Sequence, residues 1–393
     1  MKNSLIKILG GGMLACCGMP LWAQSPYVSK VIEFKPAPGQ FMNELPEYEE
    51  GDTEEDIRRK AEDYLAYNAR GMVSLGGFGG YIVLGFDHTI ANVIGEYDFK
   101  VLGNAFFASD EPDASGRYGG SSEPGVIMVS YDVNGNGLAD DPWYEIAGSE
   151  YEKPGTVKNY EITYFRPDPD TPPVTDPANP HILDAEHIRW TDNQGNEGFM
   201  PKIVFHRQDY YPAWENGDRI TFKGTKLADN GEDVYGNGEL YVLYAYDFGY
   251  ADNHPNGSDL ANIKIDWAVD ENGDPANLPG VDFVRIHSGV NQFNGSIGEC
   301  STDVMGVEDL HPEISTAITA PTTLNTTVYP NPFRSTLTIE TSRSGAATII
   351  ALTGETVFEG WLNSGTNNID LSHLSVGIYM IQTDNQVRKV IKY

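Results

Sequence analysis

Short runs of apolar and β-branched residues, separated by Gly, Asn, Asp and Pro, follow one another along this chain after residue 71. Many short strands divided by turn residues are typical of a β-sandwich or barrel. The expected strands are 81–86, 99–102, 126–131, 160–165, 202–206, 219–222, 240–246, 263–268 and 283–287. The Pro-rich stretch 166–180 predicts an exposed excursion. We therefore expect a mainly β fold, a jelly-roll-like β-sandwich.

One helix is predicted ahead of these strands. Residues 57–65 repeat apolar side chains at helical spacing. Asp52 or Thr53 can cap this helix, and the acidic residues 54–56 favour the positive end of its dipole. Gly71 ends it.

A second, smaller β-unit is predicted at the C-terminal end. Residues 313–327 are poor in charge and rich in Thr, which is typical of a linker. Beyond them the expected strands are 328–330, 337–340, 347–351, 355–359, 367–370, 378–383 and 386–392. Strands this close together within residues 328–393 suit a small Ig-like β-sandwich.

The first residues have the layout of a secretory signal peptide. Lys2 and Lys7 give a positively charged start, and a mostly apolar stretch follows at 8–19. Ala23 supplies the small residue before the cleavage site. That stretch is too short to span a bilayer and no later one is long enough, so no transmembrane segment is expected. Two alternatives stay open: lipidation at Cys16, and a buried N-terminal helix.

These boundaries divide the chain into five segments. We expect a signal peptide at 1–23, an extended segment at 24–51, a jelly-roll-like binding domain at 52–312, a linker at 313–327 and the small β-unit at 328–393.

Composition restricts the function. The chain has 57 acidic and 26 basic residues and a net charge of −31, so it repels phosphate backbones and we expect no nucleic-acid partner. Once the signal peptide is removed, Cys300 is the only cysteine, which excludes an intramolecular disulfide. Cys300 is expected to be a buried apolar residue rather than a nucleophile.

The sharpest local signal is an acidic, glycine-containing loop at 132–141. Oxygen-bearing side chains stand at loop positions 1, 3, 5 and 9, with glycine at position 6, which is how calcium loops collect their ligands. The expected Ca²⁺ ligands are Asp132, Asn134, Asn136, Leu138 through its carbonyl, Asp140 and Asp141. Position 12 is Trp143 instead of the EF-hand glutamate, so Asp141, Glu145 or a remote residue must complete the site. The alternative is an Asn-Gly hairpin turn without metal.

Patterns typical of catalysis are scarce. The sequence has no His-Glu-x-x-His pair, no Gly-x-Ser-x-Gly elbow and no phosphate-binding glycine loop. The glycine-rich stretch 76–80 precedes a strand, so we expect it to allow close backbone approach. Asp87-His88 is interpreted as a structural contact. With 57 acidic residues, a carboxylate pair for glycan hydrolysis stays open.

Aromatic residues are the other candidate for binding. Tyr210, Tyr211 and Trp214 gather rings near a loop, where they could stack on a sugar or another flat ligand. The second aromatic set, at 244–250, has rings at alternate positions and is expected to be a core stripe.

Three motifs of the tail are specific. They are VYPNPF at 328–333, LSHLSVGIY at 371–379 and the basic end RKVIK at 388–392. In this order they resemble the C-terminal sorting domain of the type IX secretion system of Bacteroidota. The resemblance implies handling by the type IX secretion machinery, passage across the outer membrane, removal of the tail and often attachment to surface lipopolysaccharide. An ordinary Ig-like binding module is the alternative.

The central domain resembles Bacteroidota cell-surface proteins with a galactose-binding-like jelly roll. The resemblance rests on LGGFGGYIVLGFD at 75–87, DFKVLGNA at 98–105, EPGVIMVSYD at 123–132, WYEIAG at 143–148 and GVDFVR at 280–285. Such proteins often accompany cobalamin uptake systems, which implies a corrinoid role. No binding residue is carried over from this resemblance.

The sequence thus predicts a secreted or outer-membrane-surface protein. We expect a calcium-stabilised binding protein without enzymatic activity, for a carbohydrate or a small nutrient such as cobalamin. A glycan-active hydrolase and a structural or adhesion protein are the alternatives.

Overall fold

The computed structural model describes residues 25–68, 70–314, 327–341, 344–351, 356–383 and 386–393. The chain divides into two compact units, residues 1–315 and 316–393. The described residues are mainly β with one α-helix, as the sequence predicts. The predicted signal peptide and most of the predicted linker lie outside the described residues. Within the described ranges, no helix is long and apolar enough to cross a membrane.

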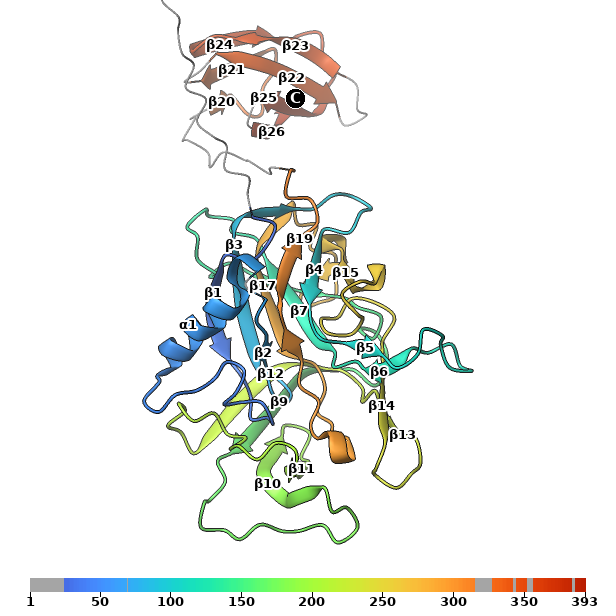
Figure 1. The fold of residues 1–393 in the computed structure, drawn as a ribbon. Coiled ribbons are helices and arrows are strands. Elements are labelled where there is room, and N and C mark those ends of the chain that lie inside the picture. The colour runs from blue at the N-terminus through green and yellow to red at the C-terminus, as the bar shows by residue number, and fades with distance from the viewer. Residues whose placement is uncertain (1–24, 69, 315–326, 342–343, 352–355, 384–385) are drawn as a thin grey trace, which may run out of the picture. The chain divides into compact units, whose positions relative to one another are not determined.

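A six-stranded antiparallel sheet lies at the centre of the first unit (Figure 1). Its order is β1 (Lys30–Lys35), β3 (Tyr81–Ala91), β17 (Gly280–Ser288), β7 (Gly125–Ser130), β8 (Trp143–Ile146) and β16 (Ala268–Val269). Successive side chains of a strand point to opposite faces of a sheet. On one face, the apolar side chains of the inner strands enter the main buried cluster: Ile82, Leu84, Val284, Ile286, Ile127 and Val129. The other face carries polar and aromatic side chains, and it borders the candidate site.

Helix α1 (Glu54–Leu65) packs beside β1 (Figure 1). Thr53 caps it in a capping box: its hydroxyl accepts from the Asp56 backbone N–H at 3.3 Å, and Asp56 accepts from the Thr53 N–H at 3.0 Å. The buried face predicted within 57–65 is confirmed. The helix ends at Leu65, earlier than predicted, and a 3₁₀ turn, η1 (Ala66–Asn68), follows.

The N-terminal segment, predicted as an extended stretch at 24–51, contains strand β1 and belongs to the first unit. Strand β1 pairs with β3, and Val28, Val31 and Phe34 are buried. The register shifts between Val31 and Glu33. This bulge interrupts the two-residue alternation that would have revealed the strand in the sequence.

A four-stranded sheet packs on a second buried cluster. Its order is β11 (Glu197–Ile203), β10 (Ile182–Asp192), β9 (Val157–Phe165) and β12 (Arg219–Lys226). The cluster contains Phe78, Tyr160, Tyr164 and Phe222. Phe78 lies in the glycine-rich stretch, where a Cβ on Gly76 would stand 2.1 Å from the Ala37 carbonyl oxygen. The predicted close backbone approach is confirmed.

Shorter strands complete the first unit. One sheet joins β13 (Gly231–Asp233), β14 (Tyr241–Tyr244), β6 (Gly119–Ser121) and β5 (Phe106–Phe107). The others join β15 (Asn262–Ile263), β4 (Phe99–Leu102) and β19 (Gly306–Asp309), and β18 (Asp303–Val304) with β2 (Val73–Ser74). The remaining 3₁₀ turns are η2 (Asp259–Ala261), η3 (Ile265–Trp267) and η4 (Gly295–Ile297). The strand expected at 263–268 is wrong, because η3 separates β15 from β16.

The second unit contains all seven strands that the tail predicts, with ends that differ by at most three residues. One sheet joins β20 (Thr327–Tyr329), β21 (Thr336–Thr341) and β24 (Gly365–Asp370). The other joins β23 (Thr356–Leu362), β22 (Gly345–Ala351), β25 (Gly377–Thr383) and β26 (Gln386–Lys392). Apolar side chains from both sheets share one buried cluster.

Lys392 ties the three tail motifs together. Its side chain is 6% exposed, and its amino group donates to the carbonyl of Leu371 at 3.0 Å and to that of Arg334. The same amino group lies 5.5 Å from the centre of the Phe333 ring. Residues from the first, second and third motifs therefore meet inside this unit.

Candidate functional site

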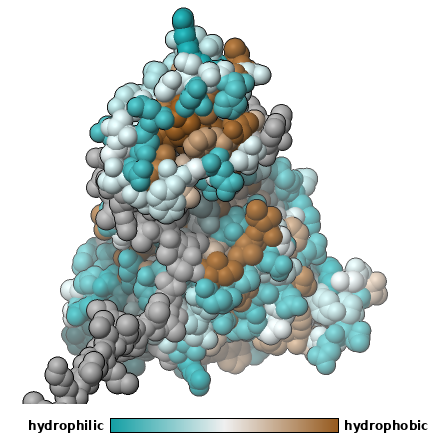
Figure 2. Space-filling view, turned by 90° about the horizontal axis from the view of Figure 1, so that it is seen from above, coloured by the Kyte–Doolittle hydropathy of each residue, from teal (hydrophilic) through white to brown (hydrophobic). Residues whose placement is uncertain are grey.

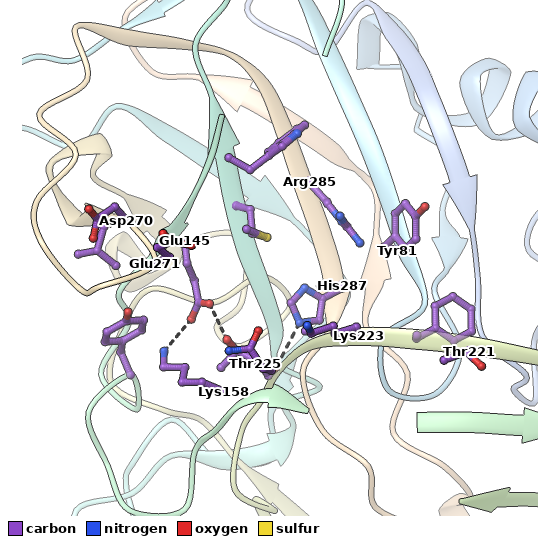
Figure 3. Close-up of a pocket in the computed structure, with 17 residues that line it drawn as sticks. Tyr81, Glu145, Lys158, Thr221, Lys223, Thr225, Asp270, Glu271, Arg285 and His287 are labelled. Carbon is purple, nitrogen blue, oxygen red and sulfur yellow. Dashed lines mark hydrogen bonds and ion pairs between the residues drawn. The ribbon is translucent and has the colours of Figure 1, made fainter. Parts of the chain in front are cut away.

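A groove of about 560 Å³ opens on the polar face of the six-stranded sheet (Figure 3). One wall consists of side chains from β3, β17, β7, β8 and β16, and the other is formed mainly by β12 with part of β9. The lining residues used below are Tyr81, Met128, Trp143, Glu145, Tyr151, Lys158, Lys223, Gly224, Thr225, Asp270, Glu271, Arg285 and His287.

The strand register determines which side chains of the six-stranded sheet form one wall of the groove. Arg285 is paired with Met128, Met128 with Glu145, and Glu145 with Val269, so these side chains form one row across four strands. Because residues two apart share a face, Trp143 lies on the same side of β8 as Glu145, and His287 on the same side of β17 as Arg285. Their neighbours in sequence point into the main core. The wall thus follows directly from the two-residue period of the strands.

Glu145 joins the two walls. One carboxylate oxygen accepts from the Lys158 amino group at 3.1 Å, and the other accepts from the Thr225 hydroxyl at 2.5 Å. Lys158 also lies over the Tyr151 ring, 2.9 Å from its centre. Burial lowers the pKa of Lys158, although Glu145 acts in the opposite direction. These contacts hold the two walls together at the end of the groove that Asp270 lines.

His287 and Gly224 set the floor of the groove. His287 is 2% exposed, and burial lowers its pKa to about 4, so the imidazole is neutral near pH 7. Its Nε2 lies 3.2 Å from the Thr225 carbonyl oxygen, which makes that nitrogen the donor. A Cβ on Gly224 would stand 2.6 Å from the same nitrogen. Only glycine lets β12 cross His287 this closely.

Arg285 and Lys223 supply positive charge. The guanidinium of Arg285 lies 4.0 Å from the centre of the Tyr81 ring, and its buried Nε has no hydrogen-bond partner. The Tyr81 hydroxyl donates to Glu33 at 2.6 Å. Lys223 is exposed on β12. The groove therefore combines aromatic surface, cations and carboxylates, which can contact apolar, anionic and hydroxyl-bearing parts of a ligand respectively.

The predicted calcium loop connects β7 to β8, next to Trp143. Ser130 pairs with Trp143, so residues 131–142 close a hairpin far longer than the two-residue turn considered as the alternative. Asp132 accepts from the backbone N–H groups of Asn136 at 3.0 Å and Gly137 at 2.6 Å. The Asn136 amide lies 3.2 Å from both Asp140 oxygens. The Asn134 amide donates to an Asp141 carboxylate oxygen at 3.4 Å, so all six expected ligands lie in a loop shaped by its own hydrogen bonds.

The donor set of this loop fits calcium in part. A carboxylate that accepts two N–H groups keeps further lone pairs for a metal. Lys30, however, donates from its amino group to the Gly137 carbonyl at 3.3 Å, next to the carbonyl expected from Leu138. Within the described residues, no group of three or more His, Cys, Asp or Glu side chains is arranged to hold a metal ion. Calcium binding stays a prediction.

The predicted aromatic platform does not form. Tyr210 and Tyr211 are 1% and 3% exposed, because both rings enter the second buried cluster. Their hydroxyls find internal partners: Tyr210 accepts from the Ile203 N–H at 3.2 Å, and Tyr211 donates to the Gly217 carbonyl at 3.3 Å. Trp214 is half-buried against the main core. The exposed stack expected of these residues is therefore wrong.

The contact predicted for Asp87-His88 and the burial predicted for Cys300 are both present. His88 lies 2.7 Å from Asp87 and 2.9 Å from Asp309 between ring nitrogen and carboxylate oxygen, which confirms a structural contact. Burial lowers the His88 pKa, but the bonds to Asp309 and Asp87 outweigh it, and the net pKa is raised. Cys300 is buried, as expected. Tyr246 and Tyr250 of the second aromatic set pack together in a buried cluster.

The sequence reasoning missed the groove residues Trp143, Arg285, His287 and Lys223 as site candidates. A signal existed in β17, where Arg285 and His287 stand at alternate positions of an otherwise apolar strand. Alternation reveals that both side chains share a face. It does not reveal that β12, more than fifty residues earlier in the chain, crosses that face.

Comparison with solved structures gives weak likenesses. An uncultured Clostridium sp. β-glucuronidase is 10% identical over 73% of this chain and 46% of its own, with a TM-score of 0.14. A Faecalibacterium prausnitzii β-glucuronidase is 10% identical over 72% and 47%, with a TM-score of 0.14. This chain spans about half the length of each, and a similarity this low carries no argument about its fold or activity.

Comparison with protein families identifies the tail. No curated protein matches the chain. Residues 327–393 match the family model described as a secretion system C-terminal sorting domain, in agreement with the three tail motifs. This domain is the sorting signal of type IX secretion, so the protein is exported to the cell surface or secreted.

Proposed function

We propose that this exported protein binds a carbohydrate in the groove between β8, β17 and β12. The observation that carries the proposal is a pair of half-buried aromatic residues, Trp143 and Tyr151, that line a groove otherwise rich in charged and hydroxyl side chains. A sugar ring has an apolar C–H face and a rim of hydroxyls. Aromatic faces pack on the first and polar groups bond the second.

The size and rigidity of the groove support this ligand class. A volume of about 560 Å³ lies within the usual range for small-ligand pockets. The contacts of Glu145 hold both walls in place before any ligand arrives. Preformed walls reduce the entropy lost on binding.

We propose binding without turnover as the activity. Both oxygens of Glu145 are engaged by Lys158 and Thr225. Asp270 accepts from two backbone N–H groups of its own turn, at 2.8 and 3.0 Å. These contacts support structural roles for both carboxylates. A corrinoid ligand stays a prediction from the resemblance, and calcium stabilisation by the 132–141 loop is part of the proposal.

The test is a glycan array probed with the recombinant chain lacking residues 1–23, followed by calorimetry with the selected saccharides and with cyanocobalamin. Loss of aromatic contact in Trp143→Ala is expected to weaken saccharide binding about tenfold or more. The matched control is Trp361→Ala, which removes an exposed tryptophan from the second unit.

Three outcomes would contradict the proposal. They are no saccharide binding, equal effects of the two tryptophan substitutions, and cleavage of the bound saccharide, which chromatography of the mixture would detect. Selective cyanocobalamin binding would assign the groove to the corrinoid instead.

A further inference from the structure

Two cations of the groove have no carboxylate partner. Neither Arg285 nor Lys223 forms an ion pair within the part of the chain that the structure describes. Glu33, which accepts from Tyr81 beneath Arg285, is paired with Lys35 at 3.6 Å. The third groove cation, Lys158, is paired with Glu145. Arg285 and Lys223 thus carry positive charge that no carboxylate of the described residues contacts directly.

This arrangement stands out in so acidic a chain. With 57 acidic and 26 basic residues, a cation has many carboxylates available to it. The buried Nε of Arg285 nevertheless has no hydrogen-bond partner. An unpaired buried donor costs free energy unless something binds it. An anion bound at the terminal nitrogens of the same guanidinium would offset this cost.

We propose that Arg285 and Lys223 bind an anionic group, a carboxylate or a sulfate, carried by the saccharide; this rests on the proposed function. The planar guanidinium of Arg285 can donate two parallel hydrogen bonds to an oxyanion. Its stacking on Tyr81 restricts its orientation before the ligand binds. Lys223, on the opposite wall, adds a second charge.

The layout of the groove orients such a ligand. Figure 3 shows Asp270 and Glu271 on one side of the groove, Arg285 and Tyr81 on the other, and His287 with Lys223 between them. Carboxylates accept from sugar hydroxyls and repel an anionic substituent. The anionic group therefore faces Arg285 and Lys223, and the hydroxyl-rich part of the saccharide faces Asp270 and Glu271.

The net charge of the whole protein does not prevent this binding. At physiological salt, charges are screened over about 8 Å, so the two nearby cations outweigh distant surface acids. His287 is neutral near pH 7, so the positive charge at this place comes from Arg285 and Lys223. Added salt should weaken the binding of an anionic saccharide more than that of a neutral one.

The experiment compares trigalacturonate with galactotriose of the same linkage, and galactose 6-sulfate with galactose, by calorimetry on the chain lacking residues 1–23. We expect the anionic member of at least one pair to bind about tenfold or more tightly. Carboxylate and sulfate are distinguished by which pair shows the preference. Lys223→Gln is expected to reduce the preference severalfold, and Arg285→Gln to abolish it.

The control is Arg219→Gln, which removes a cation from the same strand as Lys223 but outside the groove lining. Thermal melting checks that each variant folds. If Arg285→Gln does not fold, Lys223→Gln still tests the inference, because Lys223 is exposed. Equal affinity for neutral and anionic sugars, or an unchanged preference in Lys223→Gln, overturns this inference while the proposed function stands. Binding of none of these four sugars also overturns this inference, and the glycan array decides the proposed function separately.

Discussion

Single residues buried in this protein carry unusual protonation states. Asp252, Asp303 and Glu299 are each 2–3% exposed. Burial, together with the charge of the nearby Asp303, raises the pKa of Asp252 to about 8. Burial also raises the pKa of Asp303 to about 7 and that of Glu299 to about 8. Near pH 7 these carboxyl groups hold protons that they would lose in the unfolded chain.

These groups predict that stability falls as pH rises. The folded chain binds more protons than the unfolded one between about pH 4 and pH 8, so the free energy of unfolding decreases across that window. Buried His287, with its pKa lowered to about 4, acts in the opposite direction below about pH 6.5. We therefore expect the melting temperature to be lower at pH 8.5 than at pH 6.5.

Asp303→Asn should make that decrease smaller, because asparagine cannot ionise. The control is Asp110→Asn, which changes an exposed carboxylate. An Asp303→Asn variant with the same pH dependence as the unsubstituted chain would contradict this assignment.

At the scale of elements, alternation predicted all seven tail strands but fewer than half of the strands described in the first unit, and it failed for identifiable reasons. It located β4 at its exact ends, since apolar residues occupy every second position. It missed β1 because of the bulge after Val31, and β10 because most of its side chains are polar or half-exposed. The groove could not be predicted, because it depends on how β12 crosses the six-stranded sheet. Sequence periodicity reports the faces of a strand, and the partner of each face is a tertiary property.

The loop between β7 and β8 carries the calcium prediction. If calcium binds there, a chelator should lower the melting temperature, since a ligand of the folded state adds stability by mass action. Asp132→Ala should remove this sensitivity. Asp229→Ala, which removes an exposed carboxylate outside this loop, is the control. A melting curve that does not change with chelator would contradict calcium binding.

At the scale of the whole molecule, the chain joins a first unit, for which we propose saccharide binding, to a sorting unit. Much of the face shown in Figure 2 is hydrophilic, with apolar side chains gathered in a few places. The tail motifs predicted the second unit because they recur in a family with a known role. The first unit offered no such motif for its ligand, and its aromatic residues near loops, Tyr210 and Tyr211, proved to be core.

Hydrogen exchange of the chain lacking residues 1–23, with and without the saccharide that the array selects, tests the central claim most directly. If the groove is the binding site, the ligand should slow amide exchange in Trp143–Ile146, in the 221–225 part of β12 and next to Arg285. Exchange that stays unchanged there, or slows only elsewhere, would contradict the account.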